Sequence, residues 1–411
     1  MPQIEAGAGA AVVLLTLMNS TTDNIAPVLA LGNHVQDGSR MLVAMSGGVD
    51  SALTAVLLKH AGFECVGVNM RTYHPSEDDR QSGRKFQTCC SPEDAGDARS
   101  VAQLEEFPFY VLDLEKEFHD AVVNPFIQNY LRGLTPNPCV LCNNHLKLGV
   151  LLDKARIYGC DYVATGHYAR VIRNEITGRM ELHRATDRNK DQTYYLFGLS
   201  QDQLSRFVCP LGGMEKSHVR ELSREYKLSV AEKPDSMEIC FVPGNNYRDF
   251  LNRRVESGAI QSGDIVTSAG KVVGRHEGIA FYTVGQRKGL GALGPAPLYV
   301  IDILPELNLV VVGPSSETLS CGLECDRMNW VAVDQPKRPL RASAQIRYRH
   351  TPAPCAIIPS EEEGQFKIEF DEPQRSVAPG QAVVLYDGDS VLGGGWIVRR
   401  IPVVQHEETA A

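Results

Sequence analysis

The sequence lacks the features that mark several specialised classes of protein. No apolar run is long enough to cross a bilayer, and no internal repeat or low-complexity tract is visible. The eleven cysteines are too few and too unevenly spaced to form a disulfide scaffold in a chain of 411 residues. These absences predict a globular protein of the cytoplasm without a membrane partner, whose cysteines serve as reactive or metal-binding thiols.

The chain also lacks positive charge near its start. Residues 7–18 resemble the apolar core of a secretion signal, but the first basic side chain other than histidine is Arg40. Secretory and mitochondrial leaders normally carry early positive charge. We therefore expect residues 1–39 to be a poorly ordered extension and the polar tail, residues 403–411, to fray.

A net charge of −9 argues mildly against nucleic-acid binding, so an RNA-binding function needs a local basic face. The stretch 346–350 alternates, which predicts a strand with Arg347 and Arg349 on one face. Three further basic residues are close in sequence, Lys337, Arg338 and Arg341. The cluster is either a phosphate-binding face or an ordinary solvated strand.

Short apolar runs alternate with helical patterns through the first part of the chain. The predicted strands are residues 41–45, 65–70, 109–114 and 162–166. Helices are predicted near 50–61, at 92–107 and in a segment ending near 131. This order predicts an α/β fold with a doubly wound parallel sheet, in which ligands bind outside the carboxyl ends of the strands.

After about residue 249 the strands become short, and Gly and Pro turns become frequent. This pattern predicts two small β-rich domains, of which the last is barrel-like. We therefore expect a first domain at 40–248, a central β domain at 249–318 and a C-terminal β-barrel at 319–402.

A Gly-rich turn, residues 46–51, lies between the first predicted strand and the first predicted helix. Gly47 and Gly48 let the backbone approach an anion closely. Ser46 and Ser51 add hydroxyl donors, and the helix N-terminus favours negative charge. The turn has no Gly-Lys-Ser/Thr of a P-loop, and the alternative is an ordinary strand-to-helix turn. We interpret it as a phosphate-binding loop.

Three cysteines are distinguished by their surroundings. Cys139 and Cys142 form a C-x-x-C pair on a proline-rich segment that is predicted to be extended, before a helix beginning near Asn144. A position close to a helix N-terminus favours the thiolate form. Cys240 is far away in sequence, so only the fold can bring it near the pair.

The other cysteines are interpreted as structural. Cys89 and Cys90 are a tandem pair before a predicted helix. The remaining six are expected to be small buried hydrophobic side chains: Cys65, Cys160, Cys209, Cys321, Cys325 and Cys355.

Eight sequence blocks together resemble the tRNA-specific 2-thiouridylases. In chain order they are AMSGGVDS (44–51), GVNM (67–70), TPNPCVLCN (135–143), ATGHYAR (164–170), KDQTYYLF (190–197), SMEICF (236–241), VGQRKGLG (284–291) and PGQAVVLYDGD (379–389). The first block is similar to the pyrophosphate loop of the N-type ATP pyrophosphatases, which split ATP between the α and β phosphates and adenylate a carbonyl oxygen. The resemblance implies that the chain adenylates O2 of the wobble uridine of tRNA and replaces this oxygen with sulfur. It implies as partners the tRNAs for Lys, Glu and Gln and a protein that donates persulfide or sulfide.

The resemblance also implies roles for the cysteines. A persulfide forms on Cys240, and Cys142 assists the release of sulfur, which leaves a Cys142–Cys240 disulfide to be reduced. Many members carry Asp where this chain has Cys139. The third thiol opens an alternative, in which Cys139, Cys142 and Cys240 hold a 4Fe–4S cluster with an open iron for sulfide, and zinc is a minor third option.

The implied binding residues form three sets. For ATP they are Ala44, Met45, Ser46, Gly47, Gly48, Val49, Asp50, Ser51, Met70 and Gly166. For the target base they are Asn137, Pro138 and Cys139, and for the rest of the tRNA they are His167, Lys190, Asp191, Gln192, Arg347, Tyr348 and Gln381. Asp50 is either a ligand of Mg²⁺ beside the phosphates or a helix N-cap, and His167 is either a tRNA contact or a structural histidine.

Two other functions fit parts of the sequence. An ATP-dependent C–N ligase would use the loop without needing paired cysteines. A metal-stabilised RNA-binding protein would not cleave ATP and would unfold when its metal is removed.

Overall fold

The computed structural model describes residues 14–16, 28–73, 91–235, 239–242, 244, 246–291 and 296–403. The chain forms two compact units. The first comprises Met1–Val122, Cys139–Tyr247 and Asp389–Val391, and the second comprises Val123–Pro138, Arg248–Gly388 and Leu392–Ala411. Cys89 and Cys90, most of the N-terminal extension and most of the C-terminal tail lie outside the described residues.

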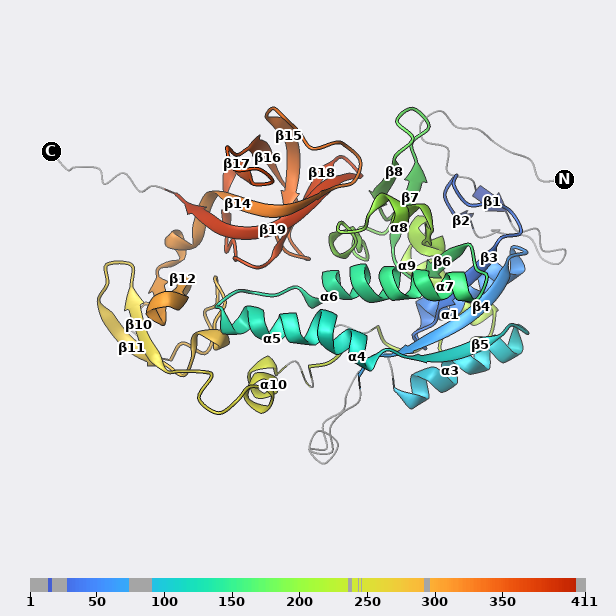
Figure 1. Ribbon diagram of the computed structural model, residues 1–411, viewed down its shortest axis with the longest axis horizontal. Helices are drawn as coiled ribbons and strands as arrows, with labels where there is room; N and C mark the ends of the chain where they lie inside the picture. Colours follow the sequence, from blue (N-terminus) through green and yellow to red (C-terminus); the bar gives the residue numbers. More distant parts are fainter. Residues whose placement is uncertain are drawn as a thin grey trace. The chain divides into compact units, whose positions relative to one another are not determined.

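A five-stranded parallel sheet is the centre of the first unit (Figure 1). In spatial order its strands are β5 (Phe109–Asp113), β4 (Glu64–Arg71), β3 (Arg40–Ala44), β6 (Tyr162–Thr165) and β9 (Phe207–Val208). All four pairings are parallel. The prediction of a doubly wound parallel sheet is confirmed, and the two-residue strand β9 is an addition that the sequence pattern did not indicate.

Helices pack on this sheet because its central strands are apolar on both faces, as buried parallel strands are. Helix α1 (Val49–His60) contacts β3, β4 and β6 and lies against α3 (Pro92–Leu104) and α9 (Lys216–Glu225). Nine of the twelve residues of α1 are buried. Each large apolar side chain removed from water in this way contributes about 1.5–3 kcal/mol.

The strand order reverses at β3, because β4 lies on one side of it and β6 on the other. Such a reversal is the place where doubly wound folds bind ligands, outside the carboxyl ends of the two strands. The turn after β3 and Gly166 after β6 therefore stand at the expected binding edge.

The remaining elements of the first unit are short. They are β1 (Leu14–Thr16) with β2 (Val28–Ala30), α4 (Glu115–Phe118), η1 (His119–Val123), η2 (Cys142–Val150), α7 (Leu151–Ile157), β7 (Ala169–Arg173) with β8 (Met180–Arg184), η3 (Thr193–Tyr195), α8 (Gln201–Ser205) and η4 (Pro210–Gly213). Helix η1 extends one residue into the second unit, and α6 (Pro138–Leu141) begins at its boundary.

The second unit holds two β structures. A four-stranded sheet has the order β11 (Val272–His276), β10 (Gly263–Thr267), β13 (Leu309–Gly313) and β12 (Tyr299–Leu304). Its other elements are α5 (Asn124–Leu131), α10 (Tyr247–Arg254), η6 (Ile279–Phe281), η7 (Pro305–Leu307) and η8 (Ser315–Thr318).

Six strands form a closed barrel, drawn in orange and red in Figure 1. They are β14 (Leu319–Trp330), β17 (Phe366–Arg375), β16 (Ala353–Pro359), β15 (Leu340–Gln345), β18 (Ala382–Asp387) and β19 (Ser390–Pro402), and β19 closes the ring on β14. Its interior is packed with apolar side chains such as Leu323, Ile357 and Phe366. The prediction of a β-rich region ending in a barrel is confirmed.

One predicted strand is wrong. Residues 346–350 form a turn after β15, in which the His350 N–H donates to the Arg347 carbonyl at 2.9 Å. The buried Gln345 amide donates to the carbonyls of Arg347 and Tyr348, at 3.2 and 2.7 Å, and these bonds replace strand pairing. Arg347 and Arg349 are exposed on this turn rather than on one face of a strand.

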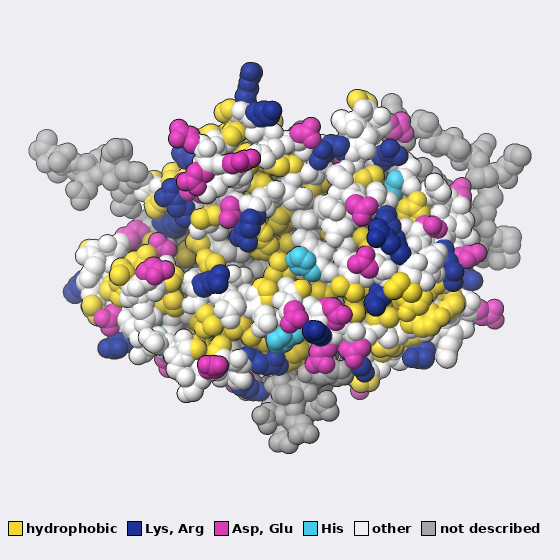
Figure 2. Space-filling view, viewed as in Figure 1, with side chains coloured by type: hydrophobic (Ala, Val, Ile, Leu, Met, Phe, Trp, Pro, Cys, Tyr) yellow, Lys and Arg dark blue, Asp and Glu magenta, His cyan; other side chains and the backbone are white. Residues whose placement is uncertain are grey.

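Within the described part of the chain, no helix has both the length and the hydrophobicity needed to cross a bilayer. On the face shown in Figure 2, basic and acidic side chains are interspersed. Any phosphate-binding surface on this face is therefore built from small local groups of basic side chains.

Candidate active site

The turn between β3 and α1 is held in a conformation that needs glycine. Gly47 has φ of +76°, and a Cβ at this position would lie 2.3 Å from the Asp94 carbonyl oxygen in the first turn of α3. The Ser46 N–H donates to Ser51 Oγ at 3.1 Å, and the Ser51 hydroxyl donates to the Gly48 carbonyl at 3.1 Å. The N-cap Gly48 provides no side-chain capping bond, so the first turn of α1 keeps N–H groups for an anion.

Neighbouring strand ends complete this loop. A Cβ on Gly166 would lie 2.9 Å from the backbone of Asp50 and Ser51, so only glycine lets the end of β6 approach α1 so closely. On the other side, the Asn69 amide donates to the Met45 carbonyl at 2.8 Å. Met70 is half-buried in β4, whereas Met45 and Val49 are core residues that can contribute only their backbone.

Asp50 is the acidic residue of the loop, and its carboxylate is bound by two side chains from other segments. Lys216 Nζ lies 2.6 and 2.7 Å from its two oxygens, and the Tyr168 hydroxyl donates to Oδ1 at 2.8 Å. Burial, with the nearby Asp50 carboxylate, raises the pKa of Tyr168, so its hydroxyl remains a donor. The alternative of Asp50 as an N-cap is wrong, because Gly48 is the N-cap and Asp50 is the second residue of the helix.

Two lysines from distant parts of the chain reach this loop, and sequence reasoning did not find them. Lys216, at the start of α9, has a side chain that is only 10% exposed. Lys233 Nζ donates to the Gly47 carbonyl at 3.0 Å and to Asp97 at 2.8 Å, and it also pairs with Asp94. No local pattern marks either lysine, because each is more than 160 residues from its partner in the loop.

Asp235 links the loop to the segment that leads toward Cys240. Its carboxylate pairs with Lys190 at 2.7 Å and with Lys216 and Arg220 at 3.0 Å each. Burial alone would raise the pKa of Asp235, but the hydrogen bonds from the two lysines outweigh burial and hold this pKa below its ordinary value. Lys216 thus contacts acidic groups of both segments.

Cys139 and Cys142 lie on a helix, so the predicted extended segment is wrong at these positions. Helix α6 begins at Pro138 and continues directly into η2, six residues before the predicted start at Asn144. Proline favours the first helical position, where its missing N–H leaves no bond unmade. The spacing of three residues places both thiols on one helix face, and both are half-buried.

Cys240 is also half-buried and lies in the first unit with the other two. Helix α4 contacts both cysteine-bearing segments. It packs against η2, and its Phe118 ring lies edge-on to Phe241, with ring centroids 5.5 Å apart. The fold therefore gives the Cys142 helix and the Cys240 segment a common neighbour.

No group of three His, Cys, Asp or Glu side chains that could hold a metal ion occurs among the described residues. As arranged, Cys139, Cys142 and Cys240 do not form such a group around a single ion such as zinc. The alternative that these three cysteines hold a 4Fe–4S cluster stays a prediction. A magnesium ion is a different case, because it binds through one or two carboxylates together with substrate phosphates and water.

Most of the remaining cysteines are buried, as predicted. Burial raises the pKa of Cys65 to about 12 and that of Cys160 to about 11, so both are inert thiols. Cys209, Cys325 and Cys355 are buried too. Cys321 is an exception: it is exposed on β14, so the prediction of a buried side chain is wrong there.

The tRNA-contact residues predicted in the first unit have partners inside the protein. His167 is buried, with Nδ1 2.6 Å from Thr165 Oγ1, which fits the structural alternative for this histidine. Asp191 accepts from the Ala185 N–H at 3.0 Å and from the Thr193 hydroxyl at 2.7 Å, and burial raises its pKa. Gln192 accepts from the Tyr168 N–H at 3.0 Å.

The tRNA-contact residues predicted in the second unit lie on two turns of the C-terminal barrel. Arg347 is exposed and donates to the Arg375 carbonyl at 3.0 Å, and Tyr348 follows it on the turn. The Gln381 amide donates to the carbonyls of Thr135 and Pro136, at 3.3 and 3.1 Å. Asn137 and Pro138, predicted to meet the target base, are buried.

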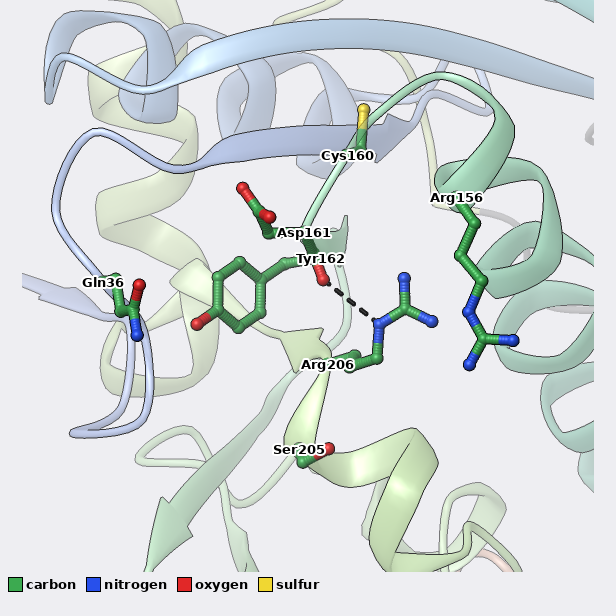
Figure 3. A pocket seen from close by; sticks show the side chains of 7 residues that line it. All are labelled: Gln36, Arg156, Cys160, Asp161, Tyr162, Ser205 and Arg206. Atoms are coloured by element: carbon green, nitrogen blue, oxygen red, sulfur yellow. Dashed lines mark hydrogen bonds between the residues drawn. The ribbon is translucent and has the colours of Figure 1, made fainter.

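A surface pocket of about 460 Å³ lies at the other edge of the sheet (Figure 3). Its residues Asp161 and Tyr162 lie at the start of β6, and Arg206 precedes β9. Arg206 Nε donates to the Asp161 carbonyl at 3.2 Å. Because this pocket is at the amino ends of the strands, it is not part of the phosphate-loop site.

Comparisons with known proteins agree with the geometry. The tRNA methyl transferase HUP domain model matches residues 39–244, the tRNA methyl transferase PRC-barrel domain model matches residues 248–314, and the aminomethyltransferase beta-barrel domain model matches residues 320–397.

Similar proteins include the tRNA-specific 2-thiouridylase MnmA of Geotalea uraniireducens (strain Rf4), which is 48% identical over 371 residues that cover 90% of this chain and 98% of that protein. The protein of the same name from Geobacter metallireducens is 49% identical over 87% of this chain and 96% of its own length. The protein of the same name from Koribacter versatilis is 49% identical over 86% of this chain and 98% of its own length. The chain belongs to the tRNA-specific 2-thiouridylase family.

Proposed function

We propose that this protein is a tRNA sulfurtransferase that uses ATP to replace O2 of the wobble uridine with sulfur, forming 2-thiouridine, AMP and pyrophosphate. The observation that carries the proposal is the match, over nearly their whole length, to relatives named tRNA-specific 2-thiouridylase. The phosphate loop and the half-buried cysteines of the first unit supply the groups that this chemistry needs.

ATP activates the uridine in the first step. The uridine O2 attacks the α-phosphorus, pyrophosphate leaves, and C2 then carries AMP as a good leaving group. We assign ATP binding to residues 44–51 with Met70 and Gly166, and Asp50 to Mg²⁺ beside the phosphates. This assignment rests on the glycine cradle at 47 and 166 and on the free N–H groups at the start of α1.

Sulfur transfer follows through two cysteines. The terminal sulfur of a persulfide on Cys240 attacks C2 and displaces AMP. The Cys142 thiolate then attacks the Cys240 sulfur, which breaks the bond to the transferred sulfur and leaves 2-thiouridine and a Cys142–Cys240 disulfide. An external dithiol supplies the two electrons that reduce this disulfide, and a donor protein renews the persulfide. The alternative carrier of sulfur is a 4Fe–4S cluster on Cys139, Cys142 and Cys240, with one iron open for sulfide.

We assign tRNA contacts within each unit separately. We assign Asn137, Pro138 and Cys139 to the target base, with the thiol of Cys139 in the place where many relatives have a carboxylate. Lys190, Asp191, Gln192, Arg347, Tyr348 and Gln381 are the proposed contacts to the tRNAs for Lys, Glu and Gln, whereas the buried His167 is assigned a structural role. We also propose that the reaction takes place in the cytoplasm. We propose domain boundaries at 40–248, 249–318 and 319–402, which the three matched family segments support.

The test is a reconstituted reaction with unmodified tRNA, ATP, Mg²⁺, a persulfide donor and a dithiol. Nucleoside mass spectrometry should find 2-thiouridine at the wobble position, and one AMP should form for each transfer. A C–N ligase would instead be identified if the protein cleaved ATP with a small-molecule amine as acceptor and without tRNA. This activity should then remain when both cysteines are replaced by serine.

A further inference from the structure

The segment that precedes the cysteine helix is bound to the C-terminal barrel within the second unit. The Thr135 N–H donates to the Pro379 carbonyl at 2.9 Å. The Gln381 amide Nε2 donates in the opposite direction, to the carbonyls of Thr135 and Pro136. Three hydrogen bonds therefore join two consecutive residues of this segment to one turn, Pro379–Gln381.

The fit between turn and segment leaves no room for a side chain. Gly380 has φ of +87°, and a Cβ there would lie 2.8 Å from Leu134 Cβ and 2.9 Å from the Thr135 nitrogen. A second glycine docks the same segment on the four-stranded sheet, because a Cβ on Gly133, at φ of +70°, would lie 2.7 Å from Ile303 Cγ2. Residues 133–136 are thus fixed at two points.

The turn itself has a rigid support. The Gly380 N–H donates to the Ile397 carbonyl, and the Ile397 N–H donates to the Gln381 carbonyl, both at 2.8 Å. Ile397 is buried in the barrel strand β19. Gln381 therefore presents its amide from a fixed backbone.

The chain leaves this docked segment directly into the cysteine helix. Pro136 and Pro138 have restricted backbone, and α6 begins at Pro138. Only two residues separate Pro136 from Cys139. If the carbonyls of residues 135 and 136 move, the first turn of the helix must therefore move with them, because the short connection has few torsion angles that could compensate.

We propose that the Pro379–Gln381 turn positions the Cys139–Cys142 helix, and that Gln381 acts as a positioning residue through the carbonyls of Thr135 and Pro136 rather than only as a contact to tRNA. The barrel turn then fixes the position of the first helical turn even in the absence of tRNA. Sulfur transfer depends on this helix because it carries Cys142. The last step rests on the proposed function, because only there does the position of Cys142 matter to a reaction.

The experiment measures alkylation of individual cysteines by iodoacetamide, using the full-length protein without tRNA or ATP and peptide mass spectrometry. Gln381→Met keeps the length of the side chain and removes the donor. We expect alkylation of Cys139 and Cys142 to become about tenfold faster, as the loss of two amide–carbonyl hydrogen bonds would allow. Cys240 should react at the wild-type rate, and continued protection of the buried Cys325 and Cys355 reports that the barrel remains folded.

Gln374→Met is the matched control, since the Gln374 amide donates to Glu372 on β17, away from the docked segment. Gln381→Glu is a second variant, in case the first does not fold, because a carboxylate facing two carbonyl oxygens removes the same bonds at the same size. This variant should also increase the rates at which Cys139 and Cys142 are alkylated.

A second readout separates positioning from tRNA contact. In single-turnover thiolation with saturating tRNA, Gln381→Met should be about tenfold slower, whereas the loss of a tRNA contact alone would raise the Kd for tRNA and leave this rate unchanged. Weaker tRNA binding with wild-type alkylation of Cys142 would overturn the proposal and leave Gln381 as a tRNA contact. If the wild-type protein made no 2-thiouridine, the proposed function would fail, yet the alkylation rates would still decide the positioning role.

Discussion

The phosphate loop and the cysteine helix are held in different ways. The loop is built inside the first unit, where Asn69 and Lys233 donate hydrogen bonds to its carbonyls and Gly166 lies close to its backbone. The cysteine helix is preceded by a segment that the second unit holds through backbone carbonyls. The difference implies that ATP activation and sulfur transfer depend on separate supports, which substitutions can break one at a time.

The largest effect is expected at the sulfur-carrying cysteine. Cys240→Ser should abolish 2-thiouridine formation, because a serine hydroxyl cannot form a persulfide, while ATP binding stays at the wild-type level. Nucleoside mass spectrometry and nucleotide binding by calorimetry measure the two properties. Cys321→Ser is the matched control, and 2-thiouridine produced by the Cys240 variant would remove this residue from the relay.

A single added methyl group should disturb the phosphate loop enough to weaken ATP binding. Gly47→Ala places a Cβ against the backbone of Asp94 at a positive φ, so the loop must move. We expect ATP binding to weaken by about 100-fold, with iodoacetamide labelling of Cys142 unchanged. Gly96→Ala on α3 is the control, since nothing lies within 4 Å of its added Cβ. Wild-type ATP affinity in Gly47→Ala would show that the cradle is not the binding site.

A smaller loss of ATP binding is expected from substitution of Lys216, one of the two lysines that sequence reasoning missed. Lys216→Met leaves the carboxylates of Asp50 and Asp235 without their shared cation. We expect ATP affinity to fall by about tenfold, because these carboxylates would then repel the phosphates. The exposed Lys271 provides the control variant, Lys271→Met. An equal loss of Cys142 reactivity would show that the two supports are not separate.

The smallest effect concerns pH. Burial lowers the pKa of His167 well below its ordinary value, so the folded protein keeps this ring neutral while the unfolded chain takes up a proton as the pH falls. The stabilising contribution is therefore complete above the ordinary pKa of about 6.5 and is lost progressively below it. When urea unfolding is measured at pH 7.5 and at pH 5.5, the free energy of unfolding should fall by about 1 kcal/mol more for the wild type than for His167→Gln. The exposed His119→Gln should behave like the wild type, and equal losses in all three proteins would place His167 in contact with solvent.

The sequence predicts the parallel sheet well because its strands are short apolar runs bounded by turns. The first predicted strand, 41–45, is β3 at Arg40–Ala44, and the first predicted helix, near 50–61, is α1 at Val49–His60. The phosphate loop is equally local, because its glycines and serines are adjacent in the chain. Where the physical cause is local, the pattern is sufficient.

The wrong predictions have causes that lie outside the local pattern. Pro138 begins a helix instead of prolonging an extended segment, and the side chain of Gln345 folds residues 346–350 into a turn. Lys216 and Lys233 reach the loop only because α9 and the segment after it return to α1 and α3. Such contacts depend on the assembled fold, so no spacing in the sequence indicates them.

The relay between the two cysteines is tested most directly by one turnover without a reductant. The protein is loaded with persulfide, mixed with ATP and tRNA, quenched with acid and digested for peptide mapping. The account predicts one Cys142–Cys240 disulfide for each 2-thiouridine formed. Formation of 2-thiouridine with both cysteines recovered as thiols would contradict it.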